Sequence, residues 1–497
     1  MENWLKAQLR IEEAQRKQSN MLVLSSLELK TLPGEIGHLH HLIEVHLSGN
    51  KLTLLPDSIC DLAKLRVLIV ESNALEALPD CIGQLQHLRY LNLSRNRLES
   101  LPESLGRLTR LDFLNLPHNR LTHLPASIGD LHQLTFLNLD HNQIGALPDS
   151  MAGLAALGDL IVSHNPLAAL PPHIGQLTRL GRIEANHTRI SVLPSSLFEL
   201  PALTRLELRH NQLAALPEAI GALSRLEYLE LAGNQLAHLP ESIGSLTRLI
   251  ELNVSDNQLR ELPESIGNLT HLRRLVLSGN RLAHLPESFR RLKNLVSLDL
   301  SGNPLTVIPD QLRDLAFSTL TLRNLPANRL PDDLHAANLE IDGCRQITKL
   351  PRRLSASAIS LADTGIRALP RSLAHATLQW RGIDIPKRLI LRPNRISLDN
   401  IYKKYYDGDN NSYREAAMRR RALVTLMGVE RFVLEAEAQG HAKQLDSDRA
   451  PEGRRRLLRI EIPFDHHEVV ALVVTPAGGD TPLVLRVPPK VKRCAEA

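Results

Sequence analysis

Asparagine recurs in this chain at intervals of 23 residues, and this period constrains the fold more than any other feature of the sequence. The asparagines are Asn50, Asn73, Asn96, Asn119, Asn142, Asn165, Asn211, Asn234, Asn257, Asn280 and Asn303, with Thr188 in the one vacant slot. A fixed period of this length is the signature of a repeat protein, in which each repeat packs against its neighbours. We therefore expect a stack of similar coils.

Each asparagine lies in the same apolar frame. The frame is L-x-x-L-x-L-x-x-N-x-L-x-x-L-P, as in Leu272 to Pro286, and it resembles the leucine-rich repeat. Leu275 and Leu277 alternate with Val276, which predicts a short strand with inward leucines and exposed residues between them. A buried Asn can donate to and accept from the backbone of adjacent coils, and the proline ends the inward segment.

The frame continues as L-P-x-x-I-G-x-L-x-x-L. Over residues 21–386 it is similar to the intracellular Ras-suppressor and plant Ras-group leucine-rich repeat proteins and their bacterial counterparts. This resemblance implies an α/β solenoid, a horseshoe with a parallel concave β-sheet. It also implies a non-enzymatic scaffold that binds a protein partner on its concave face in intracellular signalling, as a monomer and without a cofactor.

The pattern divides the chain into four parts. We expect an N-terminal cap helix over residues 1–20, regular 23-residue repeats over 21–312, shorter repeats of about 20 residues over 313–386, and a small α+β domain over 387–497. The apolar face of the cap helix is expected at Trp4, Leu5, Leu9 and Ile11. The last short coil is expected to place Ile383 in the asparagine slot, after Leu378 and Trp380.

The C-terminal part is similar to an uncharacterised domain of bacterial leucine-rich repeat proteins. The matching segments are Trp380 to Ile383, Met427 to Phe432, Arg455 to Arg459 and Leu485 to Pro489. The domain that it resembles continues beyond the point where this sequence stops, so we expect a truncated end, and no activity can be carried over from the resemblance. The residue pattern predicts a helix from Tyr413 to about Glu437, broken at Gly428, and strands at Leu457–Ile462, Val469–Thr475 and Leu483–Val487.

The exposed strand positions give the candidate partner-binding site. Six residues before the slot, the residues of interest are Tyr90, Phe113, Phe136, Arg182, Arg205 and Tyr228; four before it, they are Asn92, Asn115, Asn138, Glu184, Glu207 and Glu230. Equal positions on neighbouring parallel strands lie about 4.8 Å apart, so these residues form an aromatic stripe, an Asn rail and a charged patch. Exposed aromatics and Arg are typical of interfaces. Repeat duplication alone is the competing explanation.

Two other patterns bear on metal binding. His118, His141, His164, His187 and His210 directly precede five slots, but a ladder lacks the convergent geometry of a metal site. The segment Asp407 to Asn411 lacks the glycine and glutamate of a calcium loop, and His466–His467 lacks partners in ligand spacing. We therefore predict no metal.

Composition favours a cytoplasmic chain. It has no run of 18 apolar residues and no signal-peptide core, and its four cysteines do not form paired caps. Two alternatives to the scaffold remain. A bacterial ubiquitin ligase would need a reactive cysteine, for which only Cys494 lies outside the coils. Nucleic-acid or membrane binding would use Arg419–Arg421 and Arg454–Arg456.

Overall fold

The structure is a computed structural model, and it describes residues 2–380, 383–385, 390–391, 418, 422–425, 427–439, 442–450, 453–461, 468–476 and 483–487. The chain divides into two compact units, Met1–Pro304 and Leu305–Ala497. None of the helices in the described ranges is long and apolar enough to cross a membrane.

The first unit is a stack of coils that begins with helix α1 (Glu2–Lys17). Each coil contributes one strand, and successive strands pair in parallel with a register offset of one repeat, as in Tyr90 with Phe113. The strands are β1 (Met21–Val23), β2 (Glu44–His46), β3 (Val67–Ile69), β4 (Tyr90–Asn92), β5 (Phe113–Asn115), β6 (Phe136–Asn138), β7 (Asp159–Ile161), β8 (Arg182–Glu184), β9 (Arg205–Glu207), β10 (Tyr228–Glu230), β11 (Glu251–Asn253), β12 (Arg274–Val276) and β13 (Ser297–Asp299).

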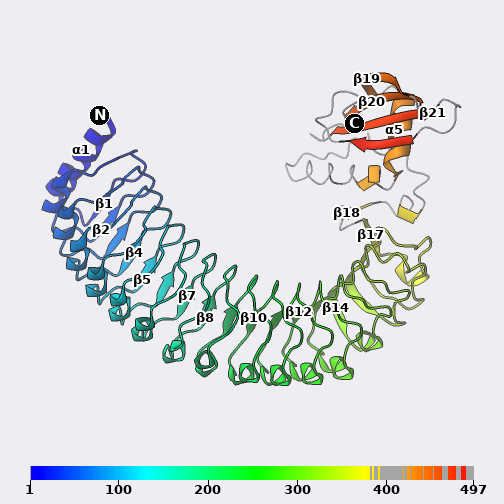
Figure 1. Cartoon of the computed structure of the whole chain (residues 1–497), viewed down its shortest axis with the longest axis horizontal. Coiled ribbons are helices and arrows are strands. Elements are labelled where there is room, and N and C mark those ends of the chain that lie inside the picture. The colour runs from blue at the N-terminus through cyan, green and yellow to red at the C-terminus, as the bar shows by residue number, and fades with distance from the viewer. Residues whose placement is uncertain are drawn as a thin grey trace. The chain divides into compact units, whose positions relative to one another are not determined.

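The strands line the inner side of this curved unit, and short 3-10 helices line its outer side (Figure 1). These helices are η1 (Gly34–His38), η2 (Asp57–Asp61), η3 (Asp80–Gln84), η4 (Glu103–Arg107), η5 (Ala126–Asp130), η6 (Asp149–Gly153), η7 (Ile174–Gln176), η8 (Ser195–Glu199), η9 (Glu218–Ala222), η10 (Glu241–Ser245), η11 (Glu264–Asn268) and η12 (Glu287–Arg291). The predicted solenoid with a parallel sheet is confirmed.

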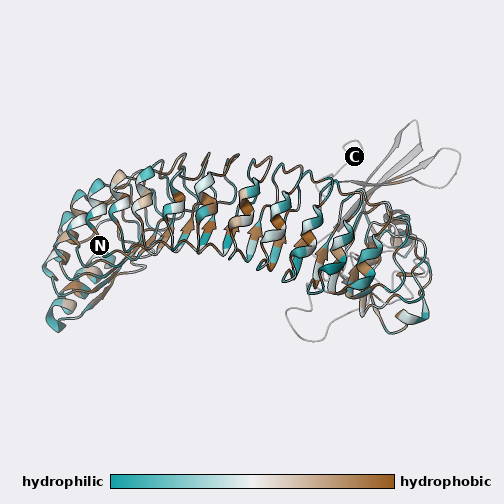
Figure 2. Cartoon of the chain, turned by 90° about the horizontal axis from the view of Figure 1, so that it is seen from below, coloured by the Kyte–Doolittle hydropathy of each residue, from teal (hydrophilic) through white to brown (hydrophobic). Residues whose placement is uncertain are grey.

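Inward leucines form a continuous core through this unit. In β5 the middle residue Leu114 is fully buried, whereas Phe113 and Asn115 on either side are half-buried and face outward. Leu116 follows and is again fully buried, as the period of two requires. In Figure 2 apolar and polar segments, brown and teal, are interspersed along the coils. Truncating such a leucine to alanine would cost about 2–5 kcal/mol.

The slot asparagines are hydrogen-bonded to backbone, as predicted, and all of them except the half-buried Asn73 are buried. Asn96 is typical: its amide donates to the carbonyls of Val70 (2.9 Å) and Leu93 (3.0 Å), and its oxygen accepts the N–H of Leu75 at 3.0 Å. Val70 and Leu75 belong to the preceding coil. Each carboxamide therefore joins two coils, and it satisfies backbone groups that would otherwise be buried without partners.

The outer side is held by contacts that the sequence pattern did not reveal. Most of the 3-10 helices start directly after the proline, and in several coils a glutamate caps the helix of the next coil. The Glu103 carboxylate accepts the N–H groups of Ala126 (3.1 Å) and Ser127 (3.0 Å) at the start of η5. The glycine of the I-G pair permits this close stacking, since a Cβ on Gly129 would lie 2.1 Å from the carbonyl oxygen of Ser150.

Helix α1 covers the first coil with a different face from the one predicted. Ala7, Ile11 and Ala14 are buried, whereas Trp4 and its apolar neighbours Leu5 and Leu9 are exposed. The buried residues follow the helical spacing of three to four, and the two alanines allow close packing. The expectation for Trp4, Leu5 and Leu9 was therefore wrong.

A disulfide joins two adjacent coils. Cys60 of η2 and Cys81 of η3 are bonded, with their Cα atoms 5.9 Å apart. The sequence analysis counted these cysteines as support for a reducing compartment. The bond removes that support, because disulfides persist mainly in oxidising environments. Spacing alone did not reveal the pair, since 21 residues bring the two side chains together only after the coils have stacked.

The second unit opens with a parallel sheet of longer strands and shorter repeats. Its strands are β14 (Ala316–Thr321), β15 (His335–Glu340), β16 (Ala358–Ser360) and β17 (Thr377–Trp380), preceded by η13 (Asp310–Asp314) and interrupted by η14 (Arg371–Leu373). Cys344 occupies a slot and donates its S–H to the Leu322 carbonyl at 2.9 Å. Contrary to expectation, Ile383 does not occupy an asparagine slot, because β18 (Ile383–Asp384) turns back and pairs antiparallel with β17.

An antiparallel meander follows in the same unit. It consists of β19 (Ala442–Ala450), β20 (Gly453–Glu461), β21 (Glu468–Pro476) and β22 (Leu483–Val487), in that order, with helix α5 (Val429–Ala438) in contact with β19 and β22. The sequence analysis missed β19. This strand lies at the edge of the sheet and reads AKQLDSDRA, so it lacks the apolar alternation that marked the other three.

Candidate functional site

Three aromatic rings stack on the inner face of the first unit. Tyr90, Phe113 and Phe136 occupy the first position of β4, β5 and β6, and we call them the aromatic stack. The centroids of Tyr90 and Phe113 are 4.4 Å apart with 5° between the ring planes, and those of Phe113 and Phe136 are 4.3 Å apart with 3°. Each ring is half-buried by its neighbours. The strand register causes this stacking, because parallel strands repeat at about 4.8 Å.

Burial and the Glu71 carboxylate raise the pKa of Tyr90. The phenol therefore keeps its proton at neutral pH and can donate a hydrogen bond from the end of the aromatic stack.

The Asn rail beside the aromatic stack is largely engaged within the protein. Asn115 donates from Nδ2 to Oδ1 of Asn92 at 3.0 Å, and Asn92 donates from Nδ2 to Glu71 Oε2 at 3.3 Å. The Asn138 side-chain oxygen accepts the N–H of Asp140 at 2.9 Å. Because these amides already have partners, they support the rings and add polarity at the border of the aromatic stack.

The Arg and Glu residues further along form internal ion pairs, and we call this group the charged patch. Arg182 pairs with Glu184 on β8, and Arg205 Nη1 lies 3.4 Å from Glu207 Oε1 on β9. The Arg205 guanidinium also lies over the Tyr228 ring, 4.0 Å from its centroid. These charges compensate one another before any partner arrives.

Glu230 is the most buried member of the charged patch. Its side chain is 6% exposed, and burial raises its pKa despite the Arg209 guanidinium, whose Nη2 lies 2.9 Å from Glu230 Oε1. The sequence analysis missed Arg209 and Glu71, which both lie two residues before a slot. Their outward position could have been predicted. The alternation that turns the residues six and four before the slot outward also turns the residue two before the slot outward.

The predicted site residues therefore lie on one face but not in one cluster. The aromatic stack and the charged patch are separated by β7, which carries Asp159 and Ile161 at the same positions. From β4 to β10 the face extends over six strand spacings, about 29 Å. A single small molecule cannot contact both ends, so a ligand of the whole face must be extended.

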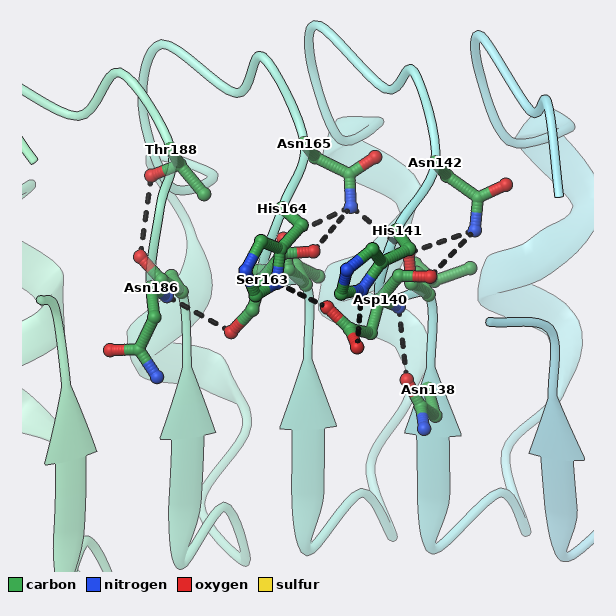
Figure 3. A network of polar contacts seen from close by, with 12 residues as sticks. Asn138, Asp140, His141, Asn142, Ser163, His164, Asn165, Asn186 and Thr188 are labelled. Carbon is green, nitrogen blue, oxygen red and sulfur yellow. Dashed lines mark hydrogen bonds and ion pairs between the residues drawn. The ribbon is translucent and has the colours of Figure 1, made fainter. Parts of the chain in front are cut away.

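The five histidines at the ends of strands β5 to β9 form a second stack, which we call the histidine ladder. Its ring centroids are 4.3, 3.9, 4.6 and 4.4 Å apart along the series from His118 to His210. Asp140 lies between two of the rings, with Oδ2 at 2.8 Å from His141 Nδ1 and Oδ1 at 3.0 Å from His164 Nδ1 (Figure 3). The sequence analysis missed Asp140.

The described residues offer little to the alternative functions. Cys344 is the free thiol among them; it is buried, and burial raises its pKa, which is the opposite of an activated nucleophile. Cys494, the Asp407 to Asn411 segment, His466–His467 and Arg419–Arg421 lie outside the described residues.

Comparisons with known proteins agree with this architecture. Residues 76–165 and 197–270 match a family model described as a leucine-rich repeat region, and residues 41–62, 271–292 and 294–315 match the Leucine Rich Repeat model. Among curated proteins, none matches the chain.

Solved structures are similar to the chain over most of its length. A leucine-rich repeat protein of Leptospira interrogans is 31% identical, with a TM-score of 0.61, and the match covers 74% of this chain and 98% of that one. The plant peptide hormone receptor RGFR1, solved in complex with RGF2, is 24% identical with a TM-score of 0.54, covering 70% and 68%. Toll of Drosophila, from the Toll–Spatzle complex, is 20% identical with a TM-score of 0.57, covering 71% and 53%. The last two likenesses concern the fold alone.

Proposed function

Because the chain belongs to the leucine-rich repeat proteins, we propose that it is a non-enzymatic scaffold for intracellular signalling that binds a protein partner on its inner face between β4 and β10. Leucine-rich repeat domains generally bind other proteins. The observation that carries the proposal here is the aromatic stack. Aromatic residues make up only 3% of this chain, yet three of them occupy successive outward positions.

The aromatic stack is suited to binding for an energetic reason. Aromatic side chains are enriched among the residues that dominate interface energies. Tyr90, Phe113 and Phe136 are held against one another in the free protein, so binding a partner would immobilise little additional side-chain freedom. Their exposed edges then offer apolar area that a partner can cover without a large entropic cost.

The charged patch has a different part in this proposal. Arg182 and Arg205 already pair with Glu184 and Glu207, so a partner gains little net affinity by replacing these contacts. Such groups mainly fix orientation and reject unsuitable partners. We therefore rank the aromatic stack above the charged patch as the source of affinity.

Site-specific photo-crosslinking tests the location. A benzophenone amino acid replaces Phe113 or Phe136, and in the control it replaces Val192, an apolar residue that is 70% exposed outside the strands. We expect the same protein adduct from positions 113 and 136 and not from position 192. Adducts that form equally from all three positions would contradict the proposal.

A double variant then tests the energetics with the captured protein. Phe113→Ala with Phe136→Ala should weaken binding by about 2 kcal/mol or more. The matched control is Leu54→Ser with Val192→Ser, which also removes two exposed apolar side chains and should leave binding unchanged. Circular dichroism melting of both variants verifies folding. A folded aromatic variant that binds normally would place the contact surface elsewhere.

A further inference from the structure

The histidine ladder and Asp140 carry an inference that is independent of the partner site. We infer that His118, Asp140 and His141 form a binding site for a divalent transition metal ion of the zinc type. One ligand atom from each of these residues lies within 4.8 Å of the other two. They come from the ends of two adjacent strands, β5 and β6, where the chain turns before the asparagine slot.

The distances are within reach of a bound ion. Zinc binds imidazole nitrogen and carboxylate oxygen at about 2.0–2.2 Å, so a bound ion requires a modest rearrangement of the three side chains, including separation of Asp140 Oδ2 from His141 Nδ1, which are 2.8 Å apart. His118 and His141 are exposed, so an ion can reach both rings from solvent, although their stacking at 4.3 Å must adjust when it binds. Two histidines and one carboxylate are a ligand set that zinc and similar ions accept, with further positions left for water.

The surroundings of Asp140 favour this arrangement. Its Oδ1 lies 3.0 Å from Nδ1 of His164, so His164 orients the carboxylate while Oδ2 faces His141. Figure 3 shows the Asp140 side chain between the His141 and His164 rings. Ligating carboxylates in proteins are commonly held in this way by an outer partner. His164 is therefore a positioning residue for the proposed site.

The backbone does not require histidine at these positions. His118 and His141 have φ of 56° and 52°, in the left-handed region that favours glycine and asparagine. Equivalent turns of other coils carry Gly49, Gly233 and Gly279 with similar φ. The geometry of the turn therefore does not explain why five successive coils carry histidine at this position.

Zinc titration of the full chain by calorimetry tests the site, with substitutions to asparagine that keep the left-handed turn. Loss of an outer partner typically costs roughly 10–100-fold in metal affinity, so loss of a direct ligand should cost at least about tenfold. We expect the unaltered chain to bind a single zinc ion. We expect the variants His118→Asn, Asp140→Asn and His141→Asn each to show this loss of zinc affinity. The matched control is His210→Asn, which has the same φ of 52° as His141 and belongs to the same ladder but lies away from Asp140.

Cobalt absorption provides a second readout. The visible band of bound Co²⁺ should change in Asp140→Asn and stay unchanged in His210→Asn, and Mg²⁺ should not displace the ion because it prefers oxygen ligands. Circular dichroism of each variant confirms that the coils remain folded. A His210→Asn variant that loses as much affinity as His141→Asn would show diffuse binding along the ladder and overturn the site. Failure of the unaltered protein to bind zinc would overturn it as well.

Discussion

Thr188 donates its hydroxyl hydrogen to the side-chain oxygen of Asn211 across 2.5 Å, and the same oxygen accepts the N–H of Ile190 at 2.9 Å. Thr188 stands in the one slot of the series without asparagine. In the preceding coil, Asn165 donates to the carbonyls of Leu139 and Val162, both within 3.0 Å. A single hydroxyl proton cannot replace these two donations, so the ladder of carboxamides is weakened at this coil.

Thr188→Asn should therefore stabilise the first unit. A carboxamide at this position can join two coils as Asn165 does, and the net gain of a typical buried hydrogen bond is about 1 kcal/mol. Chemical denaturation of the purified chain measures the change in unfolding free energy. The opposite variant, Asn211→Ala, should cost about 1–3 kcal/mol because it leaves buried groups such as the Ile190 N–H without the partner that Asn211 provides. Equal stability of all three proteins would contradict a structural role for the slot.

Reduction of the Cys60–Cys81 disulfide should lower the melting temperature. The bond closes a loop across 21 residues, and the chain-entropy model assigns such a loop about 3 kcal/mol of stabilisation. The measurement is a melting curve with and without a reductant. Cys81→Ser should melt like the reduced protein and show no further response to the reductant. An unchanged melting curve of the wild-type protein after reduction of a bond that was intact beforehand would contradict this prediction.

Thiol counting also tests the cellular location. The chain has four cysteines, so protein isolated under alkylating conditions should expose two thiols after denaturation if the disulfide forms in the cell. The expected cytoplasmic location remains a prediction, and finding all four thiols reduced would support it.

Acid should loosen the outer side of the coils. Hydrogen bonds from the backbone N–H groups of Ser288 and Glu287 lower the pKa of Glu264. A folded pKa below the unfolded value means that this stabilisation is present above about pH 4.5 and is lost as the pH falls through the folded pKa. Glu264→Gln should flatten the dependence of stability on pH below about 4.5.

Glu241 offers the comparison for that experiment. It makes a single longer contact, 3.3 Å from the Ser265 N–H to Oε2, whereas Glu264 accepts two N–H groups. Glu241→Gln should change the acid response less than Glu264→Gln. Because both carboxylates are exposed, the difference should shrink at high salt.

Some features of the inner face could be predicted from local sequence alone. The outward position of Phe113 and the inward position of Leu114 follow from the period of two along a strand, and the stacking of Tyr90 on Phe113 follows from the repeat length. The left-handed turns were less apparent, since the residue before the slot is glycine in only some coils and histidine in five successive ones.

The sequence by itself determined the repeat, because its period places the same residue type in the same environment in every coil, as with Asn96 between two coils. Only the tertiary structure decided which side chains meet between coils. The Cys60–Cys81 bond, the capping of η5 by Glu103 and the place of Asp140 between two imidazoles all depend on the lateral offset of one coil against the next. That offset results from packing of the whole stack, and no local pattern encodes it.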